Sequence, residues 1–147
     1  MTTQTYKKIL FLCTGNYYRS RFSEHLFNTL ALEKELDWWA DSRGLAIERG
    51  RDNVGAISPH ALQGLRERGL TVPDDERFPR QAIDADFATA DKIIALDEHE
   101  HRPLVEKRFP QWVDTVEYWV VHDLDQTFPP LALMQIEQHI IQLIGNW

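Results

Sequence analysis

A single cysteine and an arginine, with five residues between them, are the residues of this sequence with the clearest chemical meaning. Cys13 follows the apolar run of residues 9–12, and Arg19 is followed directly by Ser20. A cysteine thiolate is a strong nucleophile, and a guanidinium can bind two oxygens of a phosphoryl group at once. Ser20 offers a hydroxyl that could stabilise the thiolate. The spacing therefore indicates an oxyanion site, whereas an isolated cysteine after an apolar run is more often a small buried hydrophobic residue.

The residues between Cys13 and Arg19 suit a loop that wraps around an anion. Gly15 and Asn16 most readily adopt the left-handed backbone angles that a nest of backbone N–H groups requires. The loop is expected to lead from a buried strand into a helix, whose N-terminal amides and dipole favour negative charge. A cysteine in that field should exist largely as the thiolate. Besides Arg19, the residues assigned to phosphate binding are Thr14, Gly15, Asn16, Tyr17, Tyr18 and Ser20.

The elements that must position this loop are indicated by apolar patterns along the chain. The strand candidates are the apolar runs at residues 9–12, 38–40, 93–96 and 116–121, the second followed by an expected polar turn over residues 41–44. Helical spacing of apolar residues predicts a helix over residues 22–30 and another over 133–144. A further helix is expected to begin at Ser58–Pro59 and to end near Gly69.

This alternation predicts a single doubly wound α/β domain over residues 1–147, with a central four-stranded parallel sheet flanked by helices. Ligands of such sheets bind beyond the carboxyl ends of the strands. Cys13 lies at one such end and Asp123 at another, so the fold allows the two side chains to meet. The run of residues 98–101, which alternates glutamate and histidine, is expected to begin a charged helix and not to bind a metal.

Charge and composition argue against several classes of partner. The net charge is -7, whereas nucleic acids and anionic membranes attract basic surfaces. No apolar run is long enough to span a bilayer, and the first residues lack the layout of a signal peptide. Cys13 is the only cysteine, so neither an intramolecular disulfide nor a multi-cysteine metal site can form. We therefore expect a cytoplasmic protein that binds no nucleic acid, membrane, metal or cofactor.

The loop of residues 12–16 with Arg19–Ser20 resembles the phosphate-binding loop of the low-molecular-weight protein tyrosine phosphatases, a fold that also includes arsenate reductases. Residues 41–44, 53–55, 80–81, 86–87, 94–97 and 118–123 are also similar to family segments and occur in the same order. The resemblance implies hydrolysis of a phosphorylated protein or a small phosphate monoester through a phosphocysteine on Cys13. It also implies that Asp123 is the general acid and base, and that Ser42 supports Asn16.

Two features depart from the family pattern. The family's acid usually precedes a proline, but Leu124 follows Asp123, and Asp125 is a rival acid two residues further on. The aromatic residues that usually line the phenol pocket are also missing after Asp123. Tyr17 and Tyr18, or Phe128, could replace them, although ordinary packing explains these aromatic residues equally well.

Two other functions are compatible with the same loop. The protein could bind phosphate or a phosphoprotein without hydrolysing it, which the altered pocket and the missing proline favour. It could alternatively reduce arsenate, but that chemistry usually needs further cysteines, and this chain has one. Phosphate ester hydrolysis is the function that the sequence favours.

Overall fold

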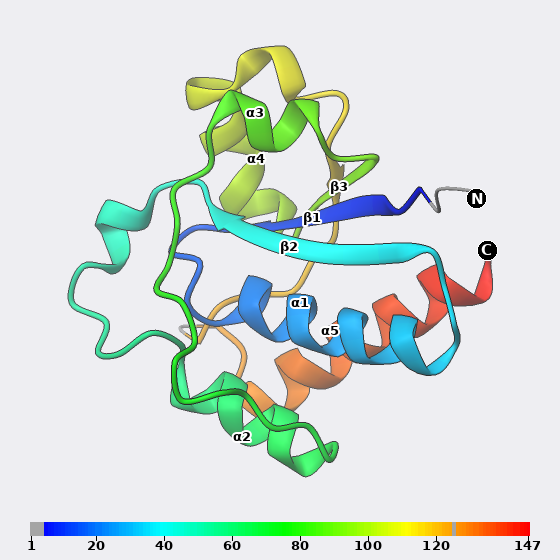
Figure 1. Cartoon of the computed structure of the whole chain (residues 1–147). Helices are drawn as coiled ribbons and strands as arrows, with labels where there is room; N and C mark the ends of the chain where they lie inside the picture. The colour runs from blue at the N-terminus through cyan, green and yellow to red at the C-terminus, as the bar shows by residue number, and fades with distance from the viewer. Residues whose placement is uncertain (1–4, 125) are drawn as a thin grey trace.

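A parallel sheet with the strand order β2-β1-β3-β4 forms the centre of the computed structural model, which describes residues 5–124 and 126–147. The strands are β1 (Lys7–Cys13), β2 (Trp38–Gly44), β3 (Lys92–Ala95) and β4 (Glu117–Tyr118). Helices lie on both faces of this sheet (Figure 1). The structure thus confirms the predicted α/β class and the four-stranded parallel sheet.

The helices form two layers around the sheet (Figure 1). One layer contains α1 (Arg19–Glu33), α2 (Pro59–Glu67) and α5 (Pro129–Gly145). The other contains α3 (Asp84–Ala88) and α4 (Glu98–Arg108). Two short 3-10 turns, η1 (Ile47–Gly50) and η2 (Pro110–Trp112), lie in the connections after β2 and α4.

The β1 strand supplies the middle of both hydrophobic cores because its successive side chains point to opposite faces of the sheet. Ile9 and Phe11 pack with the layer of α1, α2 and α5. Leu10 and Leu12 pack with the layer of α3 and α4. All four side chains are fully buried, so β1 is fixed from both faces and the position of Cys13 at its end is fixed with it.

The expected helix ends are confirmed where their capping residues are distinctive. The Ser58 hydroxyl accepts a hydrogen bond of 3.1 Å from the backbone N–H of His60, and Pro59 is the first residue of α2. Gly69 follows the end of this helix with a φ of +81°, in the left-handed region that favours glycine. The apolar stripe of the last helix is buried as expected, at Leu133, Ile136, Ile140 and Ile144.

The expected turn over residues 41–44 is wrong, because these residues continue β2. They pair in register with residues 10–13 of β1, so their backbone groups are bonded within the sheet. Their polar side chains are also paired. Arg43 lies 2.8 Å from Asp41 and 3.3 Å from Asp86 of α3. These ion pairs allow a polar sequence to lie in a strand.

The last strand is shorter than the predicted run of residues 116–121, because its partner strand ends. The β3 strand stops at Ala95, and Asp97 then caps α4 by accepting a bond from the backbone of His99. Beyond Tyr118 the chain makes separate bonds, from the backbone N–H of Trp119 to Ala95 and from that of Val121 to Leu96. These bonds still bring residue 123 to the carboxyl edge of the sheet.

Within residues 5–124 and 126–147, no helix has the length and apolarity needed to cross a membrane. In the same described residues, no three histidine, cysteine, aspartate or glutamate side chains converge where they could hold a metal ion.

Candidate active site

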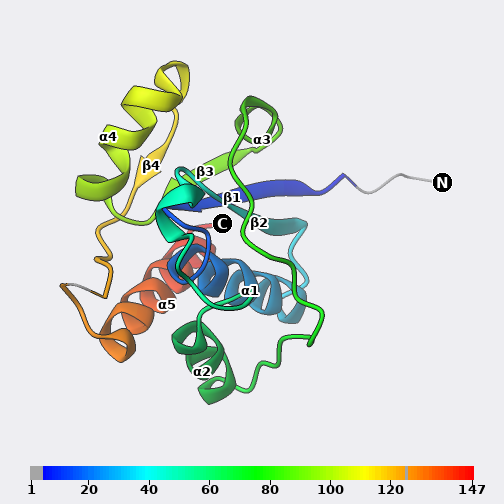
Figure 2. The ribbon, with the colours of Figure 1, turned by 90° about the vertical axis from the view of Figure 1, so that its left-hand side faces the viewer.

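The loop between β1 and α1 lies at the carboxyl edge of the sheet, which faces the viewer in Figure 2. Its Asn16 has a φ of +53°, the left-handed angle expected of a loop that turns its N–H groups to one side. Tyr18 precedes α1 but makes no side-chain cap to it, and the first turn of this helix contains no acidic residue. The N-terminal amides of α1 are therefore open to an anion.

Cys13 is buried at the end of β1, with its sulfur 2.9 Å from the Ser20 hydroxyl oxygen. The Asn16 side-chain amide donates a bond of 2.8 Å to the same Ser20 oxygen. Because Ser20 accepts from Asn16, its own proton is free to point at the sulfur. The geometry therefore allows the Ser20 hydroxyl to donate a hydrogen bond to a Cys13 thiolate, as predicted.

A polar network fixes Asn16 in its left-handed conformation. Its amide also donates to the Ser42 hydroxyl at 2.9 Å, the contact that the resemblance implied. The side-chain carbonyl oxygen of Asn16 accepts hydrogen bonds from the Arg77 guanidinium at 3.0 Å and from the backbone N–H of Arg80 at 3.1 Å. Asn16 is fully buried, so these bonds replace water at a strained position.

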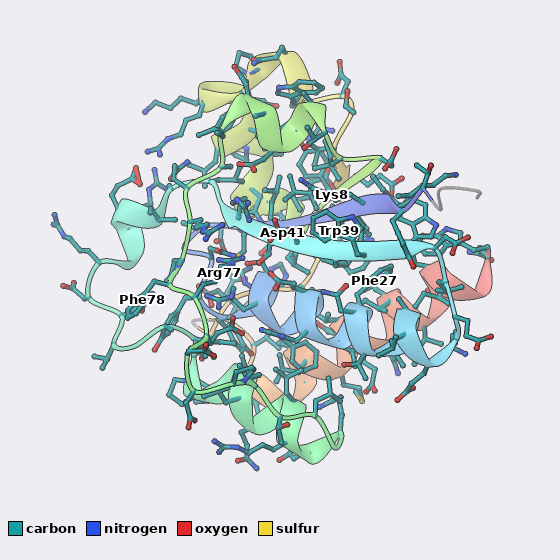
Figure 3. All side chains as sticks on the ribbon, viewed as in Figure 1. Lys8, Phe27, Trp39, Asp41, Arg77 and Phe78 are labelled. Carbon is teal, nitrogen blue, oxygen red and sulfur yellow. The ribbon has the colours of Figure 1, made fainter. Side chains whose placement is uncertain are left out.

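Arg77 links this network to the rest of the sheet, and sequence reasoning missed it. Its guanidinium lies 3.1 Å from Glu24 on α1 and 3.4 Å from Asp41 on β2. Figure 3 labels both Arg77 and Asp41. Arg77 also donates to the Ser42 backbone carbonyl at 2.9 Å. Arg77 thus connects α1, β2 and the Cys13 loop.

A second arginine that the sequence interpretation passed over, Arg21, supports the neighbouring loops from inside. Its side chain is fully buried in α1. It donates to the backbone carbonyls of Ala56 at 2.9 Å and Arg77 at 2.7 Å, and it lies 3.4 Å from the Glu76 carboxylate. These contacts pair both terminal nitrogens of the guanidinium, whereas its buried Nε finds no hydrogen-bond partner among the described residues. Only its position two residues after Arg19, on the first turn of the helix, could have indicated this role.

Arg19 lies at the base of the site with its side chain almost fully buried. Its Nη1 donates to the Val121 carbonyl at 3.0 Å, and its Nη2 lies 2.8 Å from Glu100 and 3.6 Å from Asp123. Burial alone would lower the pKa of Arg19, but the negative charges of Cys13, Glu100 and Asp123 raise it. The guanidinium therefore stays charged, and its remaining N–H donors are free for an oxyanion.

A cavity of about 550 Å³ opens in front of Cys13 and Arg19. Asp123 also lines it, so the structure brings together the three residues predicted to be catalytic. The Asp123 side chain is 45% exposed, and its carboxylate accepts a bond of 2.9 Å from the backbone N–H of Leu124. The rival acid Asp125 lies outside the described residues. The remaining lining residues are Thr14, Gly15, Tyr17, Tyr18, Arg49, Gly50, Asn53, Ser58, Pro59, His60 and Leu124.

Two of the three aromatic candidates for the pocket wall line this cavity. Tyr17 donates a bond of 2.6 Å to the Val54 carbonyl, which ties the Cys13 loop to the loop after η1. Among the described residues, the buried Tyr18 hydroxyl has no hydrogen-bond partner, and burial together with the charge of Asp123 raises the pKa of Tyr18 to about 12. Phe128 is 64% exposed and is not among the lining residues, so its proposed place in the wall is wrong.

The expected charged helix start of residues 98–101 forms as the first turn of α4, but it also contacts the site. Glu100 binds Arg19 and accepts a hydrogen bond from the Thr14 hydroxyl. His101 is fully buried, and its Nδ1 accepts a bond of 3.0 Å from the backbone N–H of Asp97. Asp97 in turn lies 2.8 Å from His122. The only sequence signal for these contacts was their position after β3, at the edge that carries Cys13.

The pKa values of this turn follow from its contacts. Burial alone would raise the pKa of Glu100, but His101 and the positive charge of Arg19 hold it well below its usual range. Burial lowers the pKa of His101. His101 therefore stays neutral, with its proton on Nε2 facing the ionised Glu100 at 3.0 Å.

Comparison with known proteins agrees with this geometry. Residues 8–127 match the family described as low molecular weight phosphotyrosine protein phosphatase. A pig protein of that name is 34% identical over 110 residues, which are 73% of this chain, and the match spans only 65% of that relative's length. A protein-arginine-phosphatase of Bacillus subtilis is 27% identical over 108 residues, covering 74% of this chain and 67% of the relative.

Among solved structures, Vibrio vulnificus Wzb in complex with benzylphosphonate superposes with a TM-score of 0.79. The superposition covers 97% of this chain and 99% of the Wzb chain, at 18% sequence identity. That similarity supports the fold alone.

Proposed function

Because the chain belongs to the low molecular weight phosphotyrosine protein phosphatase family, we propose that it hydrolyses phosphate monoesters of proteins through a phosphocysteine on Cys13. The observation that carries the proposal is the arrangement around one cavity. Cys13 faces it beside the uncapped N-terminus of α1, with Arg19 at its base and Asp123 at its wall. A nucleophile, an anion site and a proton donor are the three parts that such a reaction needs.

In the first step, the Cys13 thiolate attacks phosphorus while the bond from phosphorus to the ester oxygen breaks. Asp123, in its protonated form, gives its proton to that leaving oxygen. The loop amides and the free donors of Arg19 bind the phosphoryl oxygens, whose charge spreads in the transition state. The product of this step is an alcohol or phenol, and the phosphoryl group remains on sulfur.

In the second step, the Asp123 carboxylate takes a proton from a water molecule, and the oxygen of that water attacks the phosphocysteine. The bond from phosphorus to sulfur breaks, inorganic phosphate forms and the thiolate returns. The Ser20 hydroxyl, 2.9 Å from the sulfur, stabilises the charge that Cys13 recovers. No metal or redox cofactor takes part in this scheme.

The aromatic wall of Tyr17 and Tyr18 favours an aryl ester, so we propose phosphotyrosine as the preferred substrate. Phosphoarginine is the competing substrate to test, since one relative is a protein-arginine-phosphatase. We propose a phosphorylated protein of the cytoplasm as the partner.

The experiment that tests the proposal compares the native protein with Cys13→Ser on p-nitrophenyl phosphate, phosphotyrosine and phosphoarginine peptides. We expect turnover by the native protein, with phosphotyrosine preferred, and none by the variant. Phosphate binding without turnover by the native protein would favour the non-catalytic binding module. If the native protein hydrolysed only phosphoarginine, the proposed mechanism would stand and the substrate assignment would change.

A further inference from the structure

A carboxylate that takes no part in the proposed reaction lies against the phosphate-binding arginine. Glu100, in the first turn of α4, places Oε2 2.8 Å from Nη2 of Arg19. The same oxygen accepts the Thr14 hydroxyl proton from the Cys13 loop and lies 3.0 Å from Nε2 of His101. Glu100 is not among the residues that line the cavity. It therefore acts on a ligand through Arg19 and not by contact.

The other carboxylates near Arg19 have different tasks. Asp97 caps α4 and binds His122, and it is 3.9 Å from the guanidinium. Asp123 is 3.6 Å away on the cavity wall, where the acid is needed. Glu100 makes the shortest of these ion pairs. Its other basic neighbour, His101, is a buried neutral ring, so the charge of Glu100 is balanced by Arg19.

We propose that Glu100 is an anion built into the site that competes with phosphate for Arg19 and thereby promotes release of the product. It is a positioning residue, because it acts through the guanidinium and through Thr14. The inference rests on the proposed function, since it concerns the same oxyanion site. A phosphate dianion in the loop shares the buried Arg19 with this carboxylate, and the two negative charges repel each other.

The size of this effect follows from Coulomb's law at the dielectric of a partly buried site. Removing one negative charge several ångströms from a dianion strengthens binding by roughly threefold to tenfold. Substrate dianions feel the same repulsion, so KM falls together with the dissociation constant of phosphate. The value of kcat does not rise, because the charge acts on the ground state and the transition state alike.

Titration calorimetry with inorganic phosphate on Glu100→Gln is the direct test. Glutamine keeps an oxygen that can accept from Arg19 and Thr14 but has no charge. We expect phosphate to bind about threefold to tenfold more tightly than to the native protein, with a matching fall in KM. Glu98→Gln is the matched control, since Glu98 lies on the same helical turn and pairs with Arg102, at 3.3 Å, instead of Arg19. It should bind phosphate within about twofold of the native protein.

Glu100→Asp separates charge from contact, because it keeps the negative charge and shortens the side chain. Phosphate affinity close to native in this variant supports the inference. If Glu100→Gln and the native protein bound phosphate with equal affinity, the inference would be overturned. It would also be overturned if Glu98→Gln or Glu100→Asp tightened phosphate binding as much as Glu100→Gln does. If the native protein bound no phosphate at all, the proposed function would fall as well, so the two failures are distinguishable.

Discussion

The Ser20 hydroxyl oxygen lies 2.9 Å from the Cys13 sulfur and accepts a hydrogen bond from the Asn16 amide on its other side. This pair joins the last residue of β1 to the first turn of α1. Since Asn16 donates to Ser20, the serine proton is free to point at the sulfur. The proposed nucleophile thus depends on a donor that a chain of buried side chains holds in place.

Ser20→Ala should lower kcat by about tenfold to a hundredfold, since a hydrogen bond to a charged atom is removed. Alkylation of Cys13 by iodoacetamide should slow as well, because the sulfur loses the hydroxyl that stabilises its negative charge. Both rates can be measured on the same preparation. Ser23→Ala is the control, since this buried serine donates to the Arg19 carbonyl at 2.8 Å and does not reach the sulfur. Normal alkylation in Ser20→Ala would exclude the proposed role.

Asp123→Asn should lower kcat/KM for phosphotyrosine by about a hundredfold to ten thousandfold, because the leaving oxygen loses its proton donor. The loss on p-nitrophenyl phosphate should be smaller in the first step, since its leaving group needs little protonation. Burst kinetics separate this step from hydrolysis of the intermediate. Asp125→Asn should have little effect. The opposite pattern would assign the acid to Asp125.

Arg77→Met should destabilise the fold and loosen the Cys13 loop together. It removes the donor to Asn16 at 3.0 Å and the ion pairs to Glu24 and Asp41. We expect the free energy of unfolding to fall by about 2 kcal/mol and kcat/KM by roughly tenfold. Urea unfolding and steady-state kinetics measure the two effects. Arg66→Met, on the exposed surface of α2, should change neither, and a normal kcat/KM in Arg77→Met would show that the loop does not depend on this arginine.

His101 should make the protein less stable in mild acid. Burial lowers its pKa from the ordinary value of 6.5, so the unfolded chain binds a proton that the folded protein refuses. Its stabilising contribution is complete above pH 6.5 and is lost progressively as the pH falls from that value to the lower pKa of the folded protein. His139, whose pKa burial also lowers, acts in the same direction. In the folded protein, the Nδ1 of His101 must accept from Asp97, which a protonated ring cannot do.

Urea unfolding at about pH 7.5 and pH 5.5 measures this loss. His101→Asn, whose carbonyl oxygen can accept from Asp97, should show a smaller change between the two pH values than the native protein. His60→Asn, at an exposed position, should behave like the native protein. An unchanged pH dependence in His101→Asn would contradict the assignment.

Much of the fold and the centre of the site could be predicted because their signals are local. The apolar run before Cys13 predicted β1, and of the two residues expected in the left-handed region of the loop, Asn16 adopts it and Gly15 does not. Strand ends were less predictable. The β2 strand continues through Asp41–Gly44 because the register with β1 and two ion pairs override a polar sequence. The β4 strand ends early because β3 ends.

Of the residues that support the site, the resemblance indicated Ser42, whereas Arg77 and Glu100 could not be predicted because tertiary structure brings them into place. Arg77 and Asn16 are far apart in the sequence, and no spacing rule connects them. Glu100 belongs to a turn that its composition explained as an ordinary charged helix start. Phe128 was a reasonable aromatic candidate from its place near Asp123, but its side chain lies outside the cavity. Composition indicates which residues can do chemistry, whereas the positions of their supports depend on packing.

Trapping the phosphocysteine tests the central claim most directly. The protein is mixed with p-nitrophenyl phosphate, quenched during turnover under conditions that preserve the phosphocysteine, digested and analysed by mass spectrometry. We predict one added HPO3 group on the peptide that contains Cys13, accumulating early in the reaction and absent from Cys13→Ser. Phosphate release at the native rate by Cys13→Ser, with no phosphorylated peptide in either protein, would contradict the account.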